Sequence, residues 1–223
     1  MEHLPIYVPV VFILVVLMAI ATIYKASNRS GTFLMIITIW VIIQTILSLS
    51  GFYTITLSRP PRAAFLVLPP MIFIIALFNI KSGKQFMDKM DIRTLTIFHT
   101  LRIIVELVLF WLYTHKAVPG LMTFEGRNFD ILSGLTAPVI YYFSFVKKTI
   151  GRRALITWNI ICLGLLLNII IIGLLSAPGN MQRLAFDQPN IAIQHFPFVL
   201  LPSLLVPLVL FSHLVTIRQL SKV

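Results

Sequence analysis

One segment near the middle of the chain, Leu95–Lys116, is apolar over a length that crosses a bilayer, yet it carries ionisable side chains in its interior. A helix of about 20 residues spans the ~30 Å hydrocarbon layer of a membrane. His99, Arg102 and Glu106 lie inside this run. An ionised group in hydrocarbon costs roughly 2.5–3.5 kcal/mol on insertion scales. The sequence therefore predicts that the ionisable side of this helix faces other helices or water.

The ionisable residues of this segment share one side of the expected helix. At about 100° per residue they fall, with their polar and aromatic neighbours, within an arc of roughly 120°. This face consists of Thr96, His99, Arg102, Glu106, Phe110 and Tyr113. The remaining faces are almost entirely aliphatic or aromatic, as expected for a helix that lines a bundle.

The composition extends this expectation to the whole chain. Of its 223 residues, 58% are hydrophobic and 11% are charged, whereas soluble domains have about 25% charged residues. No polar segment is long enough for a second domain. We predict an all-α fold in which residues 1–223 form one polytopic membrane helix bundle.

Seven segments are long and apolar enough to be transmembrane helices. They are roughly Ile6–Tyr24, Thr32–Tyr53, Ala63–Ile80, Leu95–His115, Ile131–Val146, Leu155–Ser176 and Phe196–Ile217. The third and the fifth are short and contain prolines, so six spans with one re-entrant segment is the alternative. Each proline within a helix frees a backbone carbonyl, which then needs a neighbouring helix or water.

Basic residues are distributed unevenly between the two sides of such a bundle. Those that follow the odd-numbered segments are Lys25, Arg29, Lys81, Lys84, Lys89, Arg93, Lys147, Lys148, Arg152, Arg153, Arg218 and Lys222. Those that follow the even-numbered segments are Arg59, Arg62, Lys116, Arg127 and Arg183. Cytoplasmic loops carry the basic excess, which predicts the N-terminus outside and the C-terminus inside.

The formal charge of +11 indicates contact with anionic lipids at the cytoplasmic face and no nucleic-acid partner. The basic segment Lys81–Thr94 also holds apolar residues, which fits a short helix in the membrane interface. An ordinary polar turn is the alternative. A homo-oligomer or a partner membrane protein stays open.

A polar site inside the bundle is predicted from residues that share a depth range. Its members are His99, Arg102, Glu106, Tyr141, Asn159 and His213. One interpretation is a proton or ion relay, or an anion site in which Glu106 balances Arg102. The other is a structural ion pair between Arg102 and Glu106, four residues apart on one helix. No metal site is expected, and no cofactor is predicted, although His99 and His213 at matched depth offer a haem-ligation alternative.

A second group of polar residues lies on the outer side and could form a pocket there. Its members are Glu125, Arg127, Asn128, Asp130, Asp187, Asn190 and His195. The simpler interpretation is that Asp130 or Asn128 caps the following helix, and that Glu125 pairs with Arg127 in water.

Three runs, TFEGRNFDILSGLTAP, FPFVLLP and VPLVLFSHL, resemble a family of small uncharacterised bacterial multi-pass membrane proteins. The resemblance covers most of the chain and implies a bacterial inner-membrane setting. It implies no activity.

The motifs that the sequence lacks exclude several functional classes. The last apolar segment has no lysine for a retinal Schiff base, and the chain has no G-x-S-x-G or H-E-x-x-H motif and so no expected catalytic residues. The leading hypothesis is a transporter or channel for a small solute, ion or proton. The alternatives are a haem or quinone oxidoreductase and a non-catalytic accessory or scaffold subunit.

Overall fold

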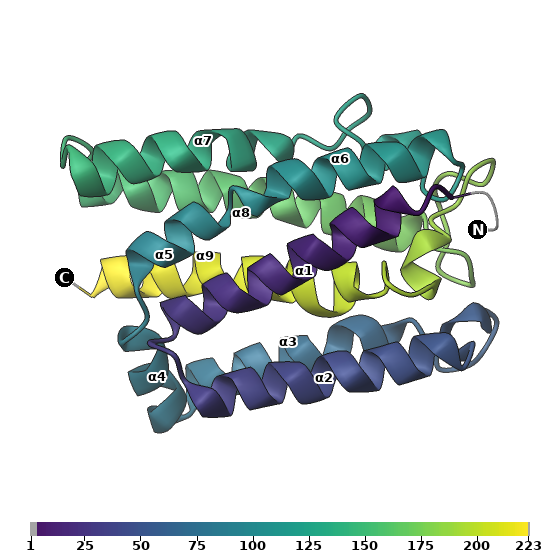
Figure 1. Cartoon of the computed structure of the whole chain (residues 1–223), viewed down its shortest axis with the longest axis horizontal. Coiled ribbons are helices and arrows are strands. Elements are labelled where there is room, and N and C mark those ends of the chain that lie inside the picture. Colours follow the sequence, from purple (N-terminus) through teal and green to yellow (C-terminus); the bar gives the residue numbers. More distant parts are fainter. Residues whose placement is uncertain (1–3, 223) are drawn as a thin grey trace.

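Most helices run along the long axis of the molecule, so that the connections gather at its two ends (Figure 1). The computed structural model describes residues 4–222, and the regular structure within this range is entirely helical. The α-helices are α1 (Tyr7–Ala26), α2 (Gly31–Leu49), α3 (Ala64–Asn79), α4 (Lys81–Asp88), α5 (Ile92–Phe98), α6 (Leu101–Thr114), α7 (Ile131–Tyr141), α8 (Arg152–Leu175) and α9 (Val206–Ser221). The short elements are the 3-10 turns η1 (Phe52–Thr54), η2 (Gly120–Met122) and η4 (Ala192–Gln194), and the π-helical turns η3 (Tyr142–Val146) and η5 (Leu201–Leu205).

The two ends of the bundle differ in the segments they hold. The start of α1 lies at one end, together with the α2–α3, α6–α7 and α8–α9 connections (Figure 1). The end of α9 lies at the opposite end, with α4 and the α1–α2 and α7–α8 connections. The segments that carry the larger group of basic residues are therefore gathered at the C-terminal end.

Within residues 4–222, five helical stretches are long and apolar enough to cross a membrane, or six if the bent pair α3–α4 is one span. The stretch Ile131–Val146 is apolar but shorter. These stretches overlap the predicted segments, although the last one runs from Leu201 to Ser221 and not from Phe196 to Ile217. The two that are too short to span by themselves, α3 and Ile131–Val146, are the two that were expected to be weak because they are short and contain prolines. The all-helical prediction is confirmed, and the count of seven stays a prediction.

The segment Lys81–Thr94 is not an ordinary polar turn, because it contains α4, bent by 91° from α3. Gly83 permits this bend: a Cβ at this position would lie 2.3 Å from the carbonyl oxygen of Leu77. Asp91 then caps α5 by accepting hydrogen bonds from the backbone N–H groups of Arg93 and Thr94.

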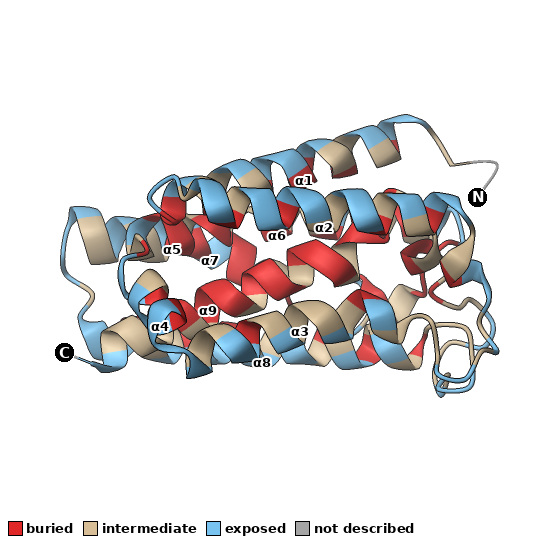
Figure 2. Ribbon diagram, turned by 90° about the horizontal axis from the view of Figure 1, so that it is seen from below, coloured by how far each residue is buried: buried red, intermediate tan, exposed pale blue. Residues whose placement is uncertain are grey.

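The most buried helix is the last one, α9, which crosses the centre of the bundle (Figure 2). In the apolar 18-residue part of the stretch Leu201–Ser221, which joins η5 to α9, 56% of the residues are buried, compared with 22% in the corresponding part of α2. The outer surfaces of α1 and α2 are instead apolar and exposed, for example at Leu17, Ile39 and Ile46. A chain in lipid is expected to place apolar side chains on its outer surface and charged side chains in its interior, and this chain does so.

A proline in α9 shows how a freed carbonyl is satisfied. Pro207 has no N–H, so the carbonyl oxygen of Ser203 loses its partner in the helix. The indole N–H of Trp40 on α2 donates to this oxygen at 2.8 Å. The expectation that a neighbouring helix supplies the missing donor is confirmed here, and the bond fixes α2 against η5, the turn that leads into α9.

An exposed ion cluster joins α4 to the end of α9. Asp88 pairs with Lys222 and Arg218, and these two cations hold the pKa of Asp88 below its ordinary value, with Lys222 as the larger cause. A carboxyl whose pKa is lowered by folding stabilises the fold above its unfolded pKa, and this stabilisation is lost as the pH falls through the folded pKa. Solvent screening keeps the effect small.

We therefore expect Asp88→Asn to lower the melting temperature slightly at pH 7. The difference from the wild type should narrow as the pH falls below the ordinary aspartate pKa. Thermal unfolding followed by circular dichroism across this pH range measures it. Asp187→Asn, at an exposed loop position, is the control, and a pH-independent difference for Asp88→Asn would contradict the prediction.

Candidate functional site

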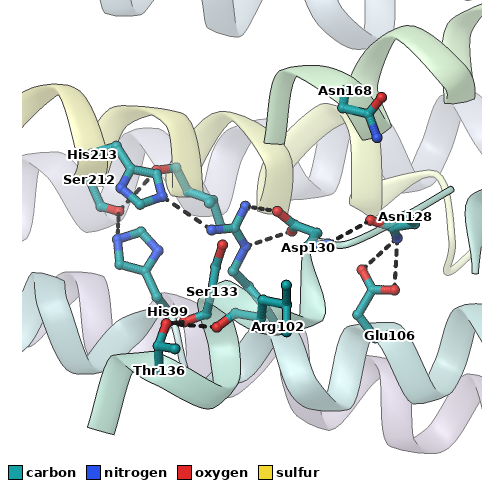
Figure 3. Close-up of polar contacts among 12 residues, drawn as sticks. His99, Arg102, Glu106, Asn128, Asp130, Ser133, Thr136, Asn168, Ser212 and His213 are labelled. Carbon is teal, nitrogen blue, oxygen red and sulfur yellow. Dashed lines mark hydrogen bonds and ion pairs between the residues drawn. The ribbon is translucent and has the colours of Figure 1, made fainter. Parts of the chain in front are cut away.

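A buried ion pair between α6 and the start of α7 is the centre of the polar network (Figure 3). The guanidinium of Arg102 donates through Nε to Asp130 Oδ2 at 2.6 Å and through Nη2 to Asp130 Oδ1. Both residues are at most 5% exposed. This two-point geometry is the strongest arrangement of an arginine with a carboxylate, and it fixes the position of Arg102.

The third contact of Arg102 determines the state of His213 on α9. Arg102 Nη1 lies 3.2 Å from His213 Nε2, and a guanidinium has only donors, so Nε2 accepts. His213 Nδ1 lies 2.8 Å from Asn159 Oδ1 on α8 and donates to it. The amide nitrogen of Asn159 donates to Leu155 O, which is consistent with this assignment. His213 is therefore the neutral Nδ1–H tautomer.

His99 lies where α5 ends and α6 has not yet begun, and its ring stacks on that of His213. The ring centroids are 3.8 Å apart and the planes differ by 12°. His99 Nε2 lies 3.0 Å from Ser212 Oγ, and this hydroxyl also donates to Val209 O. Trp158 packs edge-on against His99 at 5.7 Å. The pair is thus enclosed by α5, α8 and α9.

Beyond Asp130 the network continues to Glu106, one turn along α6 from Arg102 (Figure 3). Asn128 links them: its Oδ1 accepts the backbone N–H of Asp130 at 3.0 Å, and its Nδ2 lies 2.7 Å from both carboxylate oxygens of Glu106. Nδ2 also donates to Met122 O. Glu106 is 2% exposed and, within residues 4–222, forms no ion pair.

The close approach of α6 and α7 depends on a glycine. A Cβ at Gly134 would lie 2.8 Å from Ile103 Cγ1 and 2.9 Å from the backbone nitrogen of Ile103. These distances are shorter than real Cβ contacts. Only glycine lets the helix that begins beside Asp130 pack this tightly against the helix that carries Arg102.

A cavity of about 220 Å³ borders the network. Its wall includes Arg102, Glu106 and Asp130, together with Asn190 from the α8–α9 connection. The rest is mainly aliphatic and comes from α3, α6, η2, α8, η4, η5 and α9. A larger groove of about 320 Å³ between α2, α3 and α9 is lined by apolar residues and Ser203 and borders none of these charges.

Most of the predicted inner site is brought together. His99, Arg102, Glu106, Asn159 and His213 are all buried and belong to the network. Tyr141 does not join it. It lies at the far end of α7, about 16 Å along the helix from Asp130 at 1.5 Å per residue, and its ring packs on Phe145.

The predicted outer pocket does not form as a unit. Asn128 and Asp130 point inward and belong to the inner network, because the loop that carries them folds into the bundle. Asn190 is also buried and borders the cavity. The remaining members are exposed or half-buried, namely Glu125, Arg127, Asp187 and His195.

Neither of the two ion pairs predicted from the sequence, Arg102–Glu106 and Glu125–Arg127, forms within residues 4–222. Arg102 pairs with Asp130 and not with Glu106, since a carboxylate from α7 offers two oxygens to the guanidinium fork. The Asp130 side chain makes no capping hydrogen bond with α7. Glu125 and Arg127 form no ion pair within residues 4–222. Sequence reasoning missed Ser212, whose only signal was a small polar residue beside His213 in an apolar helix.

The histidine pair does not fit a haem in this arrangement. An iron held between two axial histidines needs the rings on opposite sides of the macrocycle, whereas these rings are in contact at 3.8 Å. His213 Nε2 also faces the cation Arg102. No group of three or more metal-binding side chains occurs in the described part of the chain.

Comparison with known proteins gives one family. A family model described as a domain of unknown function (DUF8737) matches residues 60–221. This range includes every residue of the network. No curated protein and no solved structure matches the chain.

Proposed function

The chain belongs to the DUF8737 family, a domain of unknown function, and from the site we propose that it is a proton-coupled carrier of a small solute. One observation carries this proposal: the cavity inside the bundle borders Arg102, Glu106 and Asp130, which belong to one hydrogen-bonded network. Intramembrane ionisable residues that face a cavity mark ion and substrate pathways.

In this proposal Glu106 binds and releases the proton. The charge of Arg102 is balanced by Asp130, and His213 is neutral. Among the described residues, Glu106 accepts hydrogen bonds only from the neutral amide of Asn128. The net charge of the site is therefore set by Glu106: it is zero with the proton bound and −1 without it. A change of charge beside the cavity is what couples proton binding to solute binding.

The proposed topology has seven spans in the cell's inner membrane, with the N-terminus outside and the C-terminus inside. The spans are α1, α2, α3, α5–α6, α7–η3, α8 and η5–α9. Support comes from the basic residues gathered at the C-terminal end of the bundle. The same residues, together with α4, are proposed to contact anionic lipid headgroups.

The test is proton movement into proteoliposomes that hold a pH-sensitive dye, after an imposed pH gradient with valinomycin and K⁺ to balance charge. We expect flux above that of protein-free vesicles, because in this proposal Glu106 also binds and releases a proton when no solute is bound. We expect Glu106→Gln to abolish this flux, since the amide keeps the shape but cannot bind the proton. Glu125→Gln, at an exposed loop carboxylate, should retain the flux.

Two outcomes would overturn the proposal. One is wild-type protein that moves no more protons than empty vesicles. The other is a correctly folded Glu106→Gln variant with normal flux. If Glu106→Gln lowers only the melting temperature, the network is structural and an accessory role replaces the carrier.

A further inference from the structure

The charges around the cavity favour one class of solute. The titratable and charged groups on its wall are Arg102, Glu106 and Asp130, with His213 and His99 behind Arg102. The cavity residues of α3 and α8 add no charge. The positive charge of Arg102 and the negative charge of Asp130 cancel in their ion pair. The uncompensated charge that a solute meets is therefore the carboxylate of Glu106. An anion is repelled there, and a cation is attracted.

A second polar group of the cavity lacks a partner. Asn190 is 1% exposed, and its Nδ2 donates to Gly173 O at 3.3 Å. A carbonyl oxygen only accepts, so the amide nitrogen must face Gly173. Asn190 Oδ1 is then left without a hydrogen bond from any atom of residues 4–222. A buried acceptor with no donor is unfavourable. Because Asn190 lines the cavity, a bound molecule with an N–H group would satisfy its oxygen.

The volume of the cavity and its remaining lining residues indicate what the rest of the bound molecule is like. Most of the lining is aliphatic, including Val67, Met71, Val105, Leu109, Leu166 and Ile170. The volume of about 220 Å³ lies below the roughly 300–1,000 Å³ of pockets for drug-sized ligands. The occupant is therefore small and largely apolar.

From these observations we infer that the cavity binds a small organic ammonium ion with an apolar body, in exchange for a proton on Glu106. The inference rests on the proposed function, in that the bound ion is the transported solute. Glu106 gives its proton to water, its carboxylate then holds the ammonium group, and an ammonium N–H donates to Asn190 Oδ1. The charge of the site stays zero before and after the exchange.

The experiment compares three probes that share one apolar body and differ in charge: cyclohexylammonium, cyclohexanol and cyclohexanecarboxylate. Binding to the full chain in lipid nanodiscs is measured by the shift in melting temperature at increasing probe concentration. We expect only the ammonium to stabilise the wild type and Glu125→Gln. We expect Glu106→Gln to lose the stabilisation and Asn190→Leu to weaken it.

The pH dependence of cyclohexylammonium binding is an independent test of the inference. Proton and cation compete for Glu106, so the apparent affinity for cyclohexylammonium should fall as the pH is lowered, while the amine itself stays charged. Equal stabilisation by all three probes, preference for the carboxylate, or full binding to Glu106→Gln would overturn the inference. Proton flux in proteoliposomes is a separate measurement. Normal flux without ammonium binding overturns the solute class alone, and ammonium binding without flux overturns the carrier.

Discussion

Replacing Arg102 with methionine is expected to lower the free energy of unfolding by about 3–5 kcal/mol, the loss typical of breaking a buried ion pair from one side. Methionine fills much of the same space, so the loss comes chiefly from charge. Asp130, which is 5% exposed, would keep its carboxylate without the two donors that now hold it. His213 Nε2 would also lose the donor that it faces.

A double variant separates charge from packing. Removing both members of a buried pair is often close to neutral, so Arg102→Met with Asp130→Asn should recover most of the lost stability. Arg127→Met, at an exposed position in the same loop as Asp130, should change it by less than about 0.5 kcal/mol. The free energy of unfolding of the wild type and the three variants is measured in mixed micelles by tryptophan fluorescence. If the double variant is as unstable as Arg102→Met, the pair is not the source of the loss.

Alanine at Gly134 is expected to be the next most damaging substitution, lowering the free energy of unfolding by about 1–3 kcal/mol through overpacking. Its Cβ would lie within 3.0 Å of both the side chain and the backbone of Ile103. Backbone atoms cannot rotate away, so α6 and α7 must separate. Separation at this point also moves Arg102 relative to Asp130.

A second helical glycine provides a control of opposite sign. A Cβ added at Gly164 on α8 would meet nothing within 4 Å. Alanine there removes the helix penalty of glycine and should raise the free energy of unfolding by up to about 1 kcal/mol. Parallel melting curves of the two variants test the prediction, and equal shifts for Gly134→Ala and Gly164→Ala would rule out close packing as the cause.

The helices were predictable because their signal is local. A 20-residue apolar run is read from composition alone, and prolines mark the two weak segments that prove to be bent or short. The polar face of Leu95–Lys116 was also predictable, since helical periodicity determines which side chains share a side. His99, Arg102 and Glu106 are all buried, as that face requires.

The partners of these residues were not predictable in the same way. Periodicity places residues on a face but does not say what lies opposite. Glu106, four residues from Arg102, was the obvious partner, yet Asp130 is bound instead, 28 residues further on. The loop before α7 folds inward, and its sequence, which alternates charged with aromatic residues, does not determine which of its polar side chains meets Arg102.

By itself the sequence determined an all-helical chain with apolar outer surfaces and one helix whose ionisable face must be buried, because both follow from the cost of charge in hydrocarbon. Only the tertiary structure decided that Asn128 and Asp130 join that face and that two histidines stack behind it. It also decided that a cavity borders Glu106, a carboxylate that forms no ion pair within residues 4–222. These features depend on contacts between helices, which are set by packing at positions such as Gly134 and are not encoded in any single segment.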